Sequence, residues 1–263
     1  MPIDVPIAWS SPPSNLTLAG DEIHVWKAAL IGSPLFTDLL SSDEQARSKR
    51  FLLEKHRTRF TAGRAILRMI IGSYLGVPPR EIRVQYQPNG KPEIHSFTEP
   101  ARLRFNLTHS GDLALFALTP DQEIGIDVEQ VRPCPEALQG VGPVCRTGPV
   151  RCQVPSGSRD LPAIARRFFS RQEQDWLFAQ PAEERDEAFF RIWTLKEAYL
   201  KAHGMGLAFP LDQFSVVPHL AGKEQLSFWS FKPEDGFLAA LMLLGPEKKI
   251  VGYSFTLSPS SSR

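Results

Sequence analysis

The stretch Ile124-Gly125-Ile126-Asp127-Val128-Glu129 alternates aliphatic residues with glycine or a carboxylate. Because successive side chains of a β-strand point to opposite faces, this alternation predicts a strand that buries its aliphatic residues and turns both carboxylates the same way. The two carboxylates would lie about 7 Å apart at the backbone. An exposed acidic strand face and a carboxylate pair joined by a cation are both compatible with this pattern alone.

Two more strands are expected just before this one. Residues 103–107 alternate apolar with polar side chains, and this run ends at Thr108 and His109. After a turn, residues 113–118 are all apolar, which is typical of a strand buried on both faces. Each of these two runs therefore predicts a β-strand.

A tight turn is expected further upstream. Residues 83–87 form a short β-like run, followed by the turn dipeptide Asn89-Gly90 and then by Lys91. This order presents a lysine at the tip of a hairpin.

The upstream residues 42–74 have helical periodicity, with Arg64 and Arg68 four residues apart on one face. The simplest interpretation of these two residues is a pair of surface arginines on an amphipathic helix.

Helices are also expected in the second half of the chain. Periodicity resumes at Leu161, and Ser170 with Glu173 forms a capping-box signature. A longer helix should span 183–203 and end at Gly204.

One face of that longer helix carries Phe189, Trp193, Glu197 and Lys201 at intervals of four residues. This places a carboxylate beside two aromatic rings. A surface pair of Glu197 and Lys201, worth about 0.2–0.5 kcal/mol, explains the last two positions equally well.

Residues 214–217, 226–231, 237–244 and 250–257 have the composition of strands separated by Pro and Gly. Helices therefore precede strands in each half of the chain, which favours an α+β fold over a doubly wound sheet. Within the second half, after the strand at 124–129, residues 132–160 are rich in Pro and Gly and predict a long irregular loop. It contains all three cysteines, Cys134, Cys145 and Cys152, whose odd count and spacing favour reduced thiols.

The overall charge narrows the possible partners. Thirty basic and 29 acidic residues give a net charge of +1, so no strong field draws the whole protein to nucleic acid or to an anionic membrane. No signal-peptide pattern or membrane-spanning run is visible, and the cytoplasm is the expected compartment.

Three carboxylates in one site would suit Mg²⁺, which takes oxygen ligands and commonly joins protein carboxylates to substrate phosphates. Arg64, Lys91, His109 and Lys201 are candidate anion-binding groups. The sequence contains no Walker loop, Gly-rich dinucleotide motif or His-Glu-x-x-His helix, so the common nucleotide and zinc sites lose support.

Four blocks, taken together and in this order, resemble the signature of the surfactin-synthetase-type 4'-phosphopantetheinyl transferases, and Phe168-Phe169-Ser170 precedes the last block. The resemblance extends over about residues 42–217. The blocks are Asn89-Gly90-Lys91-Pro92, Phe105-Asn106-Leu107-Thr108-His109-Ser110, Ile124-Gly125-Ile126-Asp127-Val128-Glu129 and Trp193-Thr194-Leu195-Lys196-Glu197-Ala198-Tyr199-Leu200-Lys201.

The resemblance implies an enzyme that transfers the 4'-phosphopantetheine group of coenzyme A to a serine of an apo acyl or peptidyl carrier protein and releases 3',5'-ADP. Asp127, Glu129 and Glu197 would hold Mg²⁺, with Glu197 also acting as the base and Lys201 facing the pyrophosphate. The coenzyme-binding residues would be Arg47, Arg64, Asn89, Gly90, Lys91, Thr108, His109 and Lys201. Thr108 stands where the family usually has serine.

The same resemblance implies two similar α+β halves related by a pseudo-two-fold axis, with coenzyme A in the cleft between them. The halves would be residues 1–121 and 122–263, and a monomer is expected. Residues 134–159 form an insertion relative to the family, which is either a passive surface loop or an extension of the carrier-docking surface. The alternative function is a non-catalytic module that binds coenzyme A or a carrier protein on the same scaffold.

Overall fold

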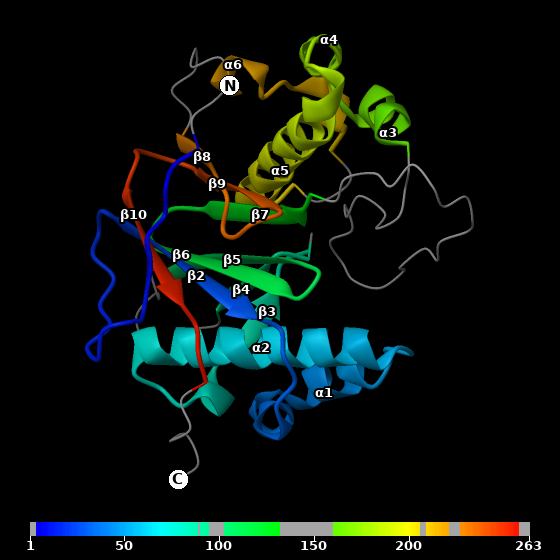
Figure 1. Ribbon diagram of the computed structural model, residues 1–263. Coiled ribbons are helices and arrows are strands. Elements are labelled where there is room, and N and C mark those ends of the chain that lie inside the picture. Colours follow the sequence, from blue (N-terminus) through cyan, green and yellow to red (C-terminus); the bar gives the residue numbers. More distant parts are fainter. Residues whose placement is uncertain are drawn as a thin grey trace. The chain divides into compact units, whose positions relative to one another are not determined.

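The computed structural model describes residues 4–88, 90–94, 103–131, 160–205, 209–220 and 227–257. The chain forms two compact units, each assembled from separate parts of the sequence (Figure 1). The first unit comprises Met1–Pro6, Tyr86–Lys91 and Glu123–Pro246. The second comprises Ile7–Gln85, Pro92–Gln122 and Glu247–Arg263.

The second unit is built on a five-stranded sheet in the order β1-β10-β2-β6-β5. Strand β10 runs parallel to β1 and β2, whereas β6 is antiparallel to both β2 and β5. The strands of this sheet are β1 (Trp9–Ser10), β2 (Glu22–Ala29), β5 (Leu103–Ser110), β6 (Leu113–Pro120) and β10 (Lys249–Ser254). A separate two-stranded sheet pairs β3 (Val84–Tyr86) with β4 (Pro92–Ile94).

Helix α2 (Glu54–Leu75) covers one face of the five-stranded sheet, with the shorter α1 (Ser42–Ser48) beside it (Figure 1). Its apolar side, including Ala62, Ile66 and Ile70, forms one core with Phe105 and Phe116 of the sheet. The helix ends at Gly76, whose φ of 66° is the left-handed conformation that glycine adopts without strain. Two short 3-10 helices, η1 (Pro34–Leu39) and η2 (Pro79–Glu81), flank these two helices in the sequence.

The predicted helix 42–74 is therefore two helices with a break at residues 49–53. The interpretation of Arg68 as a surface residue is wrong. Its guanidinium is buried, donates to Glu44 of α1 at 2.8 Å and donates to the backbone oxygen of Ile82 at 2.6 Å. The break lets α1 fold back on α2, so Arg68 pairs with a buried carboxylate that helical periodicity alone did not reveal.

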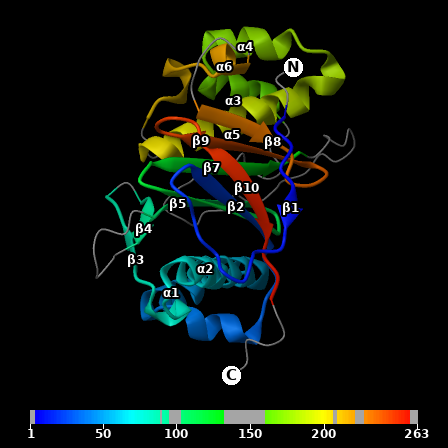
Figure 2. The same ribbon diagram turned by 90° about the vertical axis from the view of Figure 1, so that its left-hand side faces the viewer.

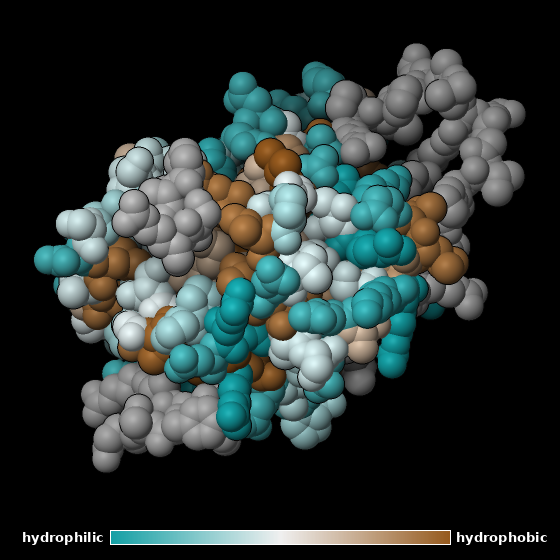
Figure 3. Space-filling model, turned by 90° about the horizontal axis from the view of Figure 1, so that it is seen from below, coloured by the Kyte–Doolittle hydropathy of each residue, from teal (hydrophilic) through white to brown (hydrophobic). Residues whose placement is uncertain are grey.

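Seen from below in Figure 3, hydrophobic residues are interspersed with hydrophilic ones across the face of the molecule.

The first unit is built on an antiparallel three-stranded sheet in the order β7-β9-β8. Its strands are β7 (Ile124–Gln130), β8 (Ser227–Phe231) and β9 (Phe237–Leu243). The long helix α5 (Arg185–His203) packs on this sheet (Figure 2), and its Phe189, Ile192 and Trp193 share a core with Leu238 and Ala240 of β9. The remaining elements are α3 (Leu161–Phe168), α4 (Arg171–Phe178), η3 (Ala182–Glu184), η5 (Leu211–Gln213) and α6 (Val217–Leu220).

The α+β fold class is confirmed, since each unit combines a sheet with packed helices. The capping box of Ser170 and Glu173 and the helix end at Gly204 are also confirmed. The strand predicted at 214–217 is wrong, because this segment runs from η5 into α6. Residues 134–159 lie outside the described residues.

The two compact units differ from the predicted halves in three segments, which are Met1–Pro6, Tyr86–Lys91 and the C-terminal residues. Strand β10 pairs with β1 and β2, so residues 247–263 belong with the N-terminal part of the chain. The division of the chain into two α+β halves at residues 1–121 and 122–263 stays a prediction. Within the described part of the chain, no helix has both the length and the apolar character needed to cross a membrane.

Candidate active site

Strand β7 and helix α5 carry four charged side chains into one region of the first unit. Asp127 and Glu129 lie on the same face of β7, two residues apart, and both are buried despite their charge. Glu197 and Lys201 lie one helical turn apart on α5, and Glu197 is also buried. The predicted alternation in β7 is confirmed, and the interpretation of an exposed acidic strand face is wrong.

Lys201 links the helix directly to the strand. Its Nζ donates to Oδ1 of Asp127 at 2.6 Å and to the backbone oxygen of Ile126 at 3.1 Å. Lys201 therefore forms its ion pair with Asp127 on the neighbouring strand β7, rather than with Glu197 one turn earlier on its own helix.

The charge on Lys201 is sustained by its surroundings. Burial alone lowers the pKa of this ammonium, but the negative charges of Asp127, Glu197 and Glu129 raise it, and the net result is a raised pKa. Lys201 therefore stays protonated at neutral pH and acts as a fixed positive charge rather than as a base. The influence of all three carboxylates on this one group shows that the four side chains form a single electrostatic cluster.

Gly125 allows β7 and α5 to approach this closely. A Cβ atom at this position would lie 2.1 Å from the backbone oxygen of Ala198 and 2.4 Å from the backbone nitrogen of Ala202. Neither backbone atom can move without shifting the helix, so only glycine fits here. The distance between the strand carboxylates and the helix charges is thus set by a backbone contact.

Stacked aromatic rings support the site-bearing face of α5. The rings of Phe169 and Phe189 are stacked with centroids 5.0 Å apart, and those of Phe189 and Trp193 with centroids 5.9 Å apart. Phe168 meets the Trp193 ring edge-on at 6.1 Å. The predicted aromatic stripe therefore forms part of the core that fixes the helix immediately before Glu197.

Lys91 follows the turn between β3 and β4 but is not an exposed lysine at a hairpin tip. Its Nζ donates to Oε2 of Glu123 at 2.6 Å and lies within hydrogen-bond distance of the backbone oxygens of Ile124 and Ala202, at 3.4 and 3.2 Å. The side chain is buried. The turn itself is as expected, with Gly90 at φ 87°, while Asn89 lies outside the described residues. Lys91 thus connects the beginning of β7 to the last turn of α5.

In the second unit, the predicted coenzyme-binding arginines are brought together by an aromatic ring. The guanidinium of Arg47, from α1, lies 5.4 Å from the ring centroid of Phe60, and that of Arg64, from α2, lies 5.6 Å from it. The Phe51 ring packs against the same ring at 5.3 Å. A guanidinium on an aromatic face keeps its N–H donors available at the ring edge, which suits an anion-binding role.

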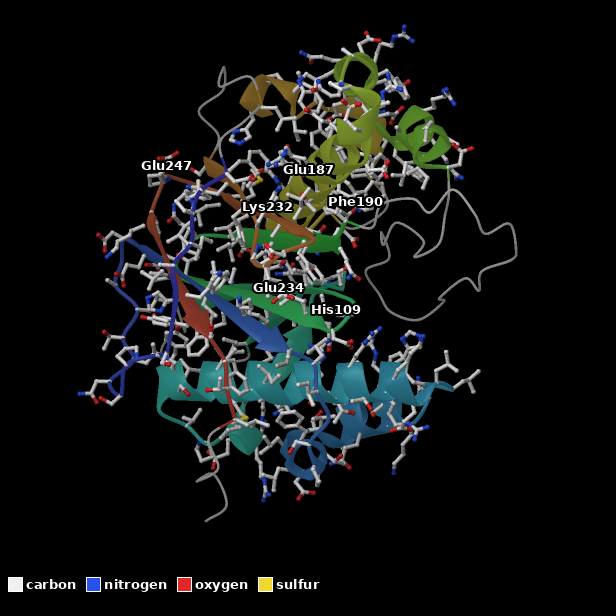
Figure 4. The ribbon with its side chains drawn as sticks, in the orientation of Figure 1. His109, Glu187, Phe190, Lys232, Glu234 and Glu247 are labelled. Carbon is white, nitrogen blue, oxygen red and sulfur yellow. The ribbon has the colours of Figure 1, made fainter. Side chains whose placement is uncertain are left out.

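Thr108 and His109 are neighbours near the end of β5 and point to opposite sides of the strand. Thr108 is buried, whereas His109 is exposed (Figure 4). His109 is thus the more accessible of the two to a ligand in solution.

The donor chemistry of the acidic cluster in the first unit decides whether this cluster suits Mg²⁺. Among the described residues, no three His, Cys, Asp or Glu side chains are arranged as a metal-binding group. The donor set nevertheless fits Mg²⁺: three buried carboxylates are hard oxygen ligands, and these three negative charges face one ammonium within the cluster. A divalent cation would balance the remaining two negative charges of these four groups.

Comparisons with known proteins agree with this geometry. Residues 25–121 match the family described as "4'-phosphopantetheinyl transferase, N-terminal", and residues 123–241 match the "4'-phosphopantetheinyl transferase superfamily". The chain is 39% identical over 247 residues to the 4'-phosphopantetheinyl transferase HetI of Nostoc sp., covering 90% of this chain and 94% of that protein. The chain belongs to the 4'-phosphopantetheinyl transferase superfamily.

This transferase is also similar to the surfactin-type members, as its signature blocks suggested. It is 29% identical to the 4'-phosphopantetheinyl transferase Sfp of Bacillus subtilis, with 72% of this chain and 70% of that protein covered. It is 33% identical to the 4'-phosphopantetheinyl transferase psf-1 of Bacillus pumilus, with 64% and 58% covered. The resemblance to this family is therefore confirmed. The two family matches meet at residue 122, where the chain also passes from the second compact unit to the first.

Three residues with contacts near these groups were not predicted from the sequence of this transferase. Phe60 stands four residues before Arg64 on one helix, and this spacing is compatible with a contact between the ring and the guanidinium. Glu123, the partner of Lys91, gave no signal of its own. Lys196 lies inside a recognised block, but its buried contact with Glu173 was not visible in the spacing.

Proposed function

We propose that this transferase moves the 4'-phosphopantetheine arm of coenzyme A to a serine hydroxyl of an apo acyl or peptidyl carrier protein, with Mg²⁺, and releases 3',5'-ADP. The observation that carries the proposal is the cluster of Asp127, Glu129, Glu197 and Lys201 on β7 and α5. It offers oxygen ligands for a metal, a carboxylate base and a fixed cation in one unit of a chain that belongs to this family.

Asp127, Glu129 and Glu197 would hold Mg²⁺. When bound, the ion would neutralise charge on the pyrophosphate of coenzyme A. The protein groups then have distinct tasks. Asp127 also orients Lys201, to which it is hydrogen-bonded at 2.6 Å. Lys201, kept protonated by its carboxylate neighbours, would stabilise the negative charge that develops on the leaving phosphate.

In the transfer step, the Oγ of the carrier serine attacks the phosphorus that bears the pantetheine arm. A new O–P bond forms to the serine, and the P–O bond to the neighbouring phosphate breaks. The electron pair of that bond leaves with 3',5'-ADP, and the serine proton passes to Glu197, directly or through a water molecule. Glu197 is our choice of base because it is buried on α5 within the same cluster as Lys201.

The coenzyme-binding roles remain part of the proposal. Arg47 and Arg64, assembled around Phe60, would bind phosphate, and His109, with Thr108, would contact the 3'-phosphate end. Lys91 was also expected to bind phosphate. An ammonium has three donors, and the three acceptors around Lys91 are all protein atoms, so a phosphate contact would have to replace one of them. Asn89 and Gly90 would shape its turn.

Other features stay predictions from the resemblance and the composition. These are the pseudo-two-fold relation of two similar halves, the coenzyme between them, a monomeric state and the cytoplasm. No nucleic-acid or membrane partner is expected, since the net charge is only +1.

The alternative function is a non-catalytic module that binds coenzyme A or a carrier protein. The joint presence of Asp127, Glu129, Glu197 and Lys201 in one cluster disfavours it, since binding alone does not require a buried base. A magnesium-dependent phosphohydrolase is a third candidate.

One experiment separates the three candidates. The protein is incubated with coenzyme A, Mg²⁺ and an apo carrier protein, and the carrier is then weighed by mass spectrometry. A carrier mass increased by one phosphopantetheine group supports the transferase. An unchanged carrier with intact coenzyme supports the binding module, and cleaved coenzyme without carrier gain supports the hydrolase.

A further inference from the structure

A fully buried ion pair lies on a different side of α5 from the acidic cluster. Lys196 and Glu173 both have 0% exposed side chains, and neither has a role in the transfer step described above. The Nζ of Lys196 donates to both carboxylate oxygens of Glu173, at 2.8 and 2.7 Å, and to the backbone oxygen of Phe214 at 2.7 Å. All three donors of the ammonium are therefore used.

Glu173 is equally well satisfied. Its Oε1 accepts from the backbone nitrogen of Val216 at 2.9 Å, and its Oε2 accepts from the backbone nitrogen of Ser170 at 2.7 Å, which closes the capping box of α4. The ammonium of Lys196 also lies 4.1 Å from the ring centroid of Phe214. One ion pair thus joins α4, α5 and the segment 214–216.

Burying an ion pair to hold three segments together has a high cost in desolvation free energy. Removing each charge from water costs several kcal/mol, and a well-packed apolar pair of similar volume is often at least as stable. Packing alone therefore does not account for a lysine and a glutamate here. What an ion pair with directed hydrogen bonds provides in addition is a fixed position and rotation of the segments that it joins.

Lys196 directly precedes Glu197 in the helix, so the two side chains leave α5 about 100° apart. Holding Lys196 on one side therefore fixes the direction of Glu197 on the other. On the cluster side, Lys201 is bonded to Asp127, and Gly125 keeps β7 in backbone contact with Ala198. Side chains end roughly 5–6 Å from a helix axis, so a rotation of about 10° would move the Glu197 carboxylate by about 1 Å. Displacements of that size can reduce catalytic rates by about 100-fold.

We propose that Lys196 and Glu173 form a positioning pair that sets the rotation of α5 and so places the Glu197 carboxylate for metal binding and proton transfer. This inference rests on the proposed function of Glu197. Neither residue touches the substrate, and the pair acts through the helix.

The test compares wild type with Glu173→Gln and with the double variant Glu173→Gln/Lys196→Met, which leaves no uncompensated buried charge. For each protein we measure thermal stability, coenzyme A affinity, kcat for carrier modification and, by calorimetry, Mg²⁺ affinity. We expect both variants to fold and to bind coenzyme A within about threefold of wild type, with kcat lowered by at least about tenfold and Mg²⁺ affinity lowered by at least about threefold.

Arg68 and Glu44 supply a matched control, because they form another buried ion pair, at 2.8 Å, in the second unit. The variant Glu44→Gln/Arg68→Met should lose stability while Mg²⁺ affinity stays at the wild-type value.

Any one of three outcomes overturns the inference. The first is a folded Glu173→Gln protein with wild-type kcat and wild-type Mg²⁺ affinity, and the second is a double variant that recovers stability and kcat together. The third is a loss of Mg²⁺ affinity in the control variant Glu44→Gln/Arg68→Met that equals the loss in the Glu173 variants. If the double variant does not fold, Glu173→Gln alone decides. A wild-type protein that does not modify any carrier would instead refute the proposed function, whatever the variants show.

Discussion

The Nζ of Lys201 on α5 lies 2.6 Å from Oδ1 of Asp127 on β7, and both side chains are largely buried. This contact brings the two elements that carry the candidate catalytic groups into a fixed relation. It also explains the raised pKa of Lys201: burial lowers this pKa, but Asp127 and the neighbouring carboxylates raise it by more.

Glu197→Gln should remove most of the turnover while coenzyme A affinity stays within about tenfold of wild type. The amide keeps the shape of the side chain but is a poor metal ligand and cannot accept the serine proton. Carrier modification by mass spectrometry and coenzyme binding by calorimetry measure the two effects. Glu187→Gln is the control on the same helix, since Glu187 pairs with Arg191 and Lys232 instead (Figure 4). Near wild-type turnover of the Glu197 variant would refute its role.

Lys91→Met should reduce both stability and coenzyme affinity if Lys91 binds phosphate as proposed. Loss of the ammonium leaves the backbone oxygens of Ile124 and Ala202 without this donor, which lowers the free energy of unfolding by about 1–3 kcal/mol. Chemical denaturation and calorimetry separate the two effects. In the control, Glu123→Gln, Lys91 is retained and coenzyme affinity should not fall. A Lys91→Met protein that is destabilised yet binds coenzyme A normally would make Lys91 a purely structural residue.

His109→Ala should lower coenzyme affinity with little change in selectivity among carriers, because the exposed His109 is proposed to meet the 3'-phosphate. Dephospho-coenzyme A, which lacks this phosphate, provides the check. Wild type should prefer coenzyme A over the dephospho form, and the variant should lose most of that preference. Equal discrimination by both proteins would show that His109 does not contact the 3'-phosphate.

Local patterns were enough to predict β7 and α5, because period-two alternation and four-residue spacing are properties of single elements. Asp127, Glu129, Glu197 and Lys201 could therefore be named from the sequence. Their burial and the pairing of Lys201 with Asp127 depend on contacts between residues far apart in the chain, about which those patterns carry no information.

The error at 214–217 has a specific physical cause. This apolar run resembles a strand, but the backbone oxygen of Phe214 accepts from Lys196 and the backbone nitrogen of Val216 donates to Glu173. Buried side-chain charges thus satisfy backbone groups that a strand would pair with a neighbour. Strand β2 was missed for a different reason, since its sequence Glu22–Ala29 mixes charged and aromatic residues without a clear period.

Gly125→Ala should separate β7 from α5 and so impair both stability and turnover. The new Cβ would lie 2.1 Å from the backbone oxygen of Ala198, and backbone cannot yield as a flexible side chain would. Overpacking of this kind costs about 1–3 kcal/mol or more. Gly20→Ala is the control, because nothing lies within 4 Å of its Cβ position. Urea denaturation and carrier modification measure the effects, and an unaltered Gly125→Ala enzyme would contradict the close contact.

The last prediction concerns a buried histidine in the second unit, remote in sequence from the cluster. Trp26 donates to the hydroxyl of Tyr74 at 2.9 Å, and that hydroxyl lies 2.6 Å from Nδ1 of His24, while Nε2 of His24 lies 3.2 Å from Glu22. A neutral imidazole that donates from Nε2 to Glu22 and accepts at Nδ1 from Tyr74 satisfies this chain. Burial lowers the pKa of His24, more than the hydrogen bond and charge of Glu22 raise it.

Because the folded-state pKa lies below the unfolded value of about 6.5, the unfolded chain binds more protons as the pH falls through that value. His24 therefore contributes stability that is fully present above about pH 6.5 and is lost as the pH falls toward the folded-state pKa. We expect the free energy of unfolding, measured in urea, to decrease from pH 7.5 to 5.5, and His24→Gln to flatten this slope. Tyr74→Phe removes the hydroxyl but leaves the imidazole buried, so it should be less stable at every pH while keeping the slope. A His24→Gln protein with the wild-type pH dependence would show that another group controls it.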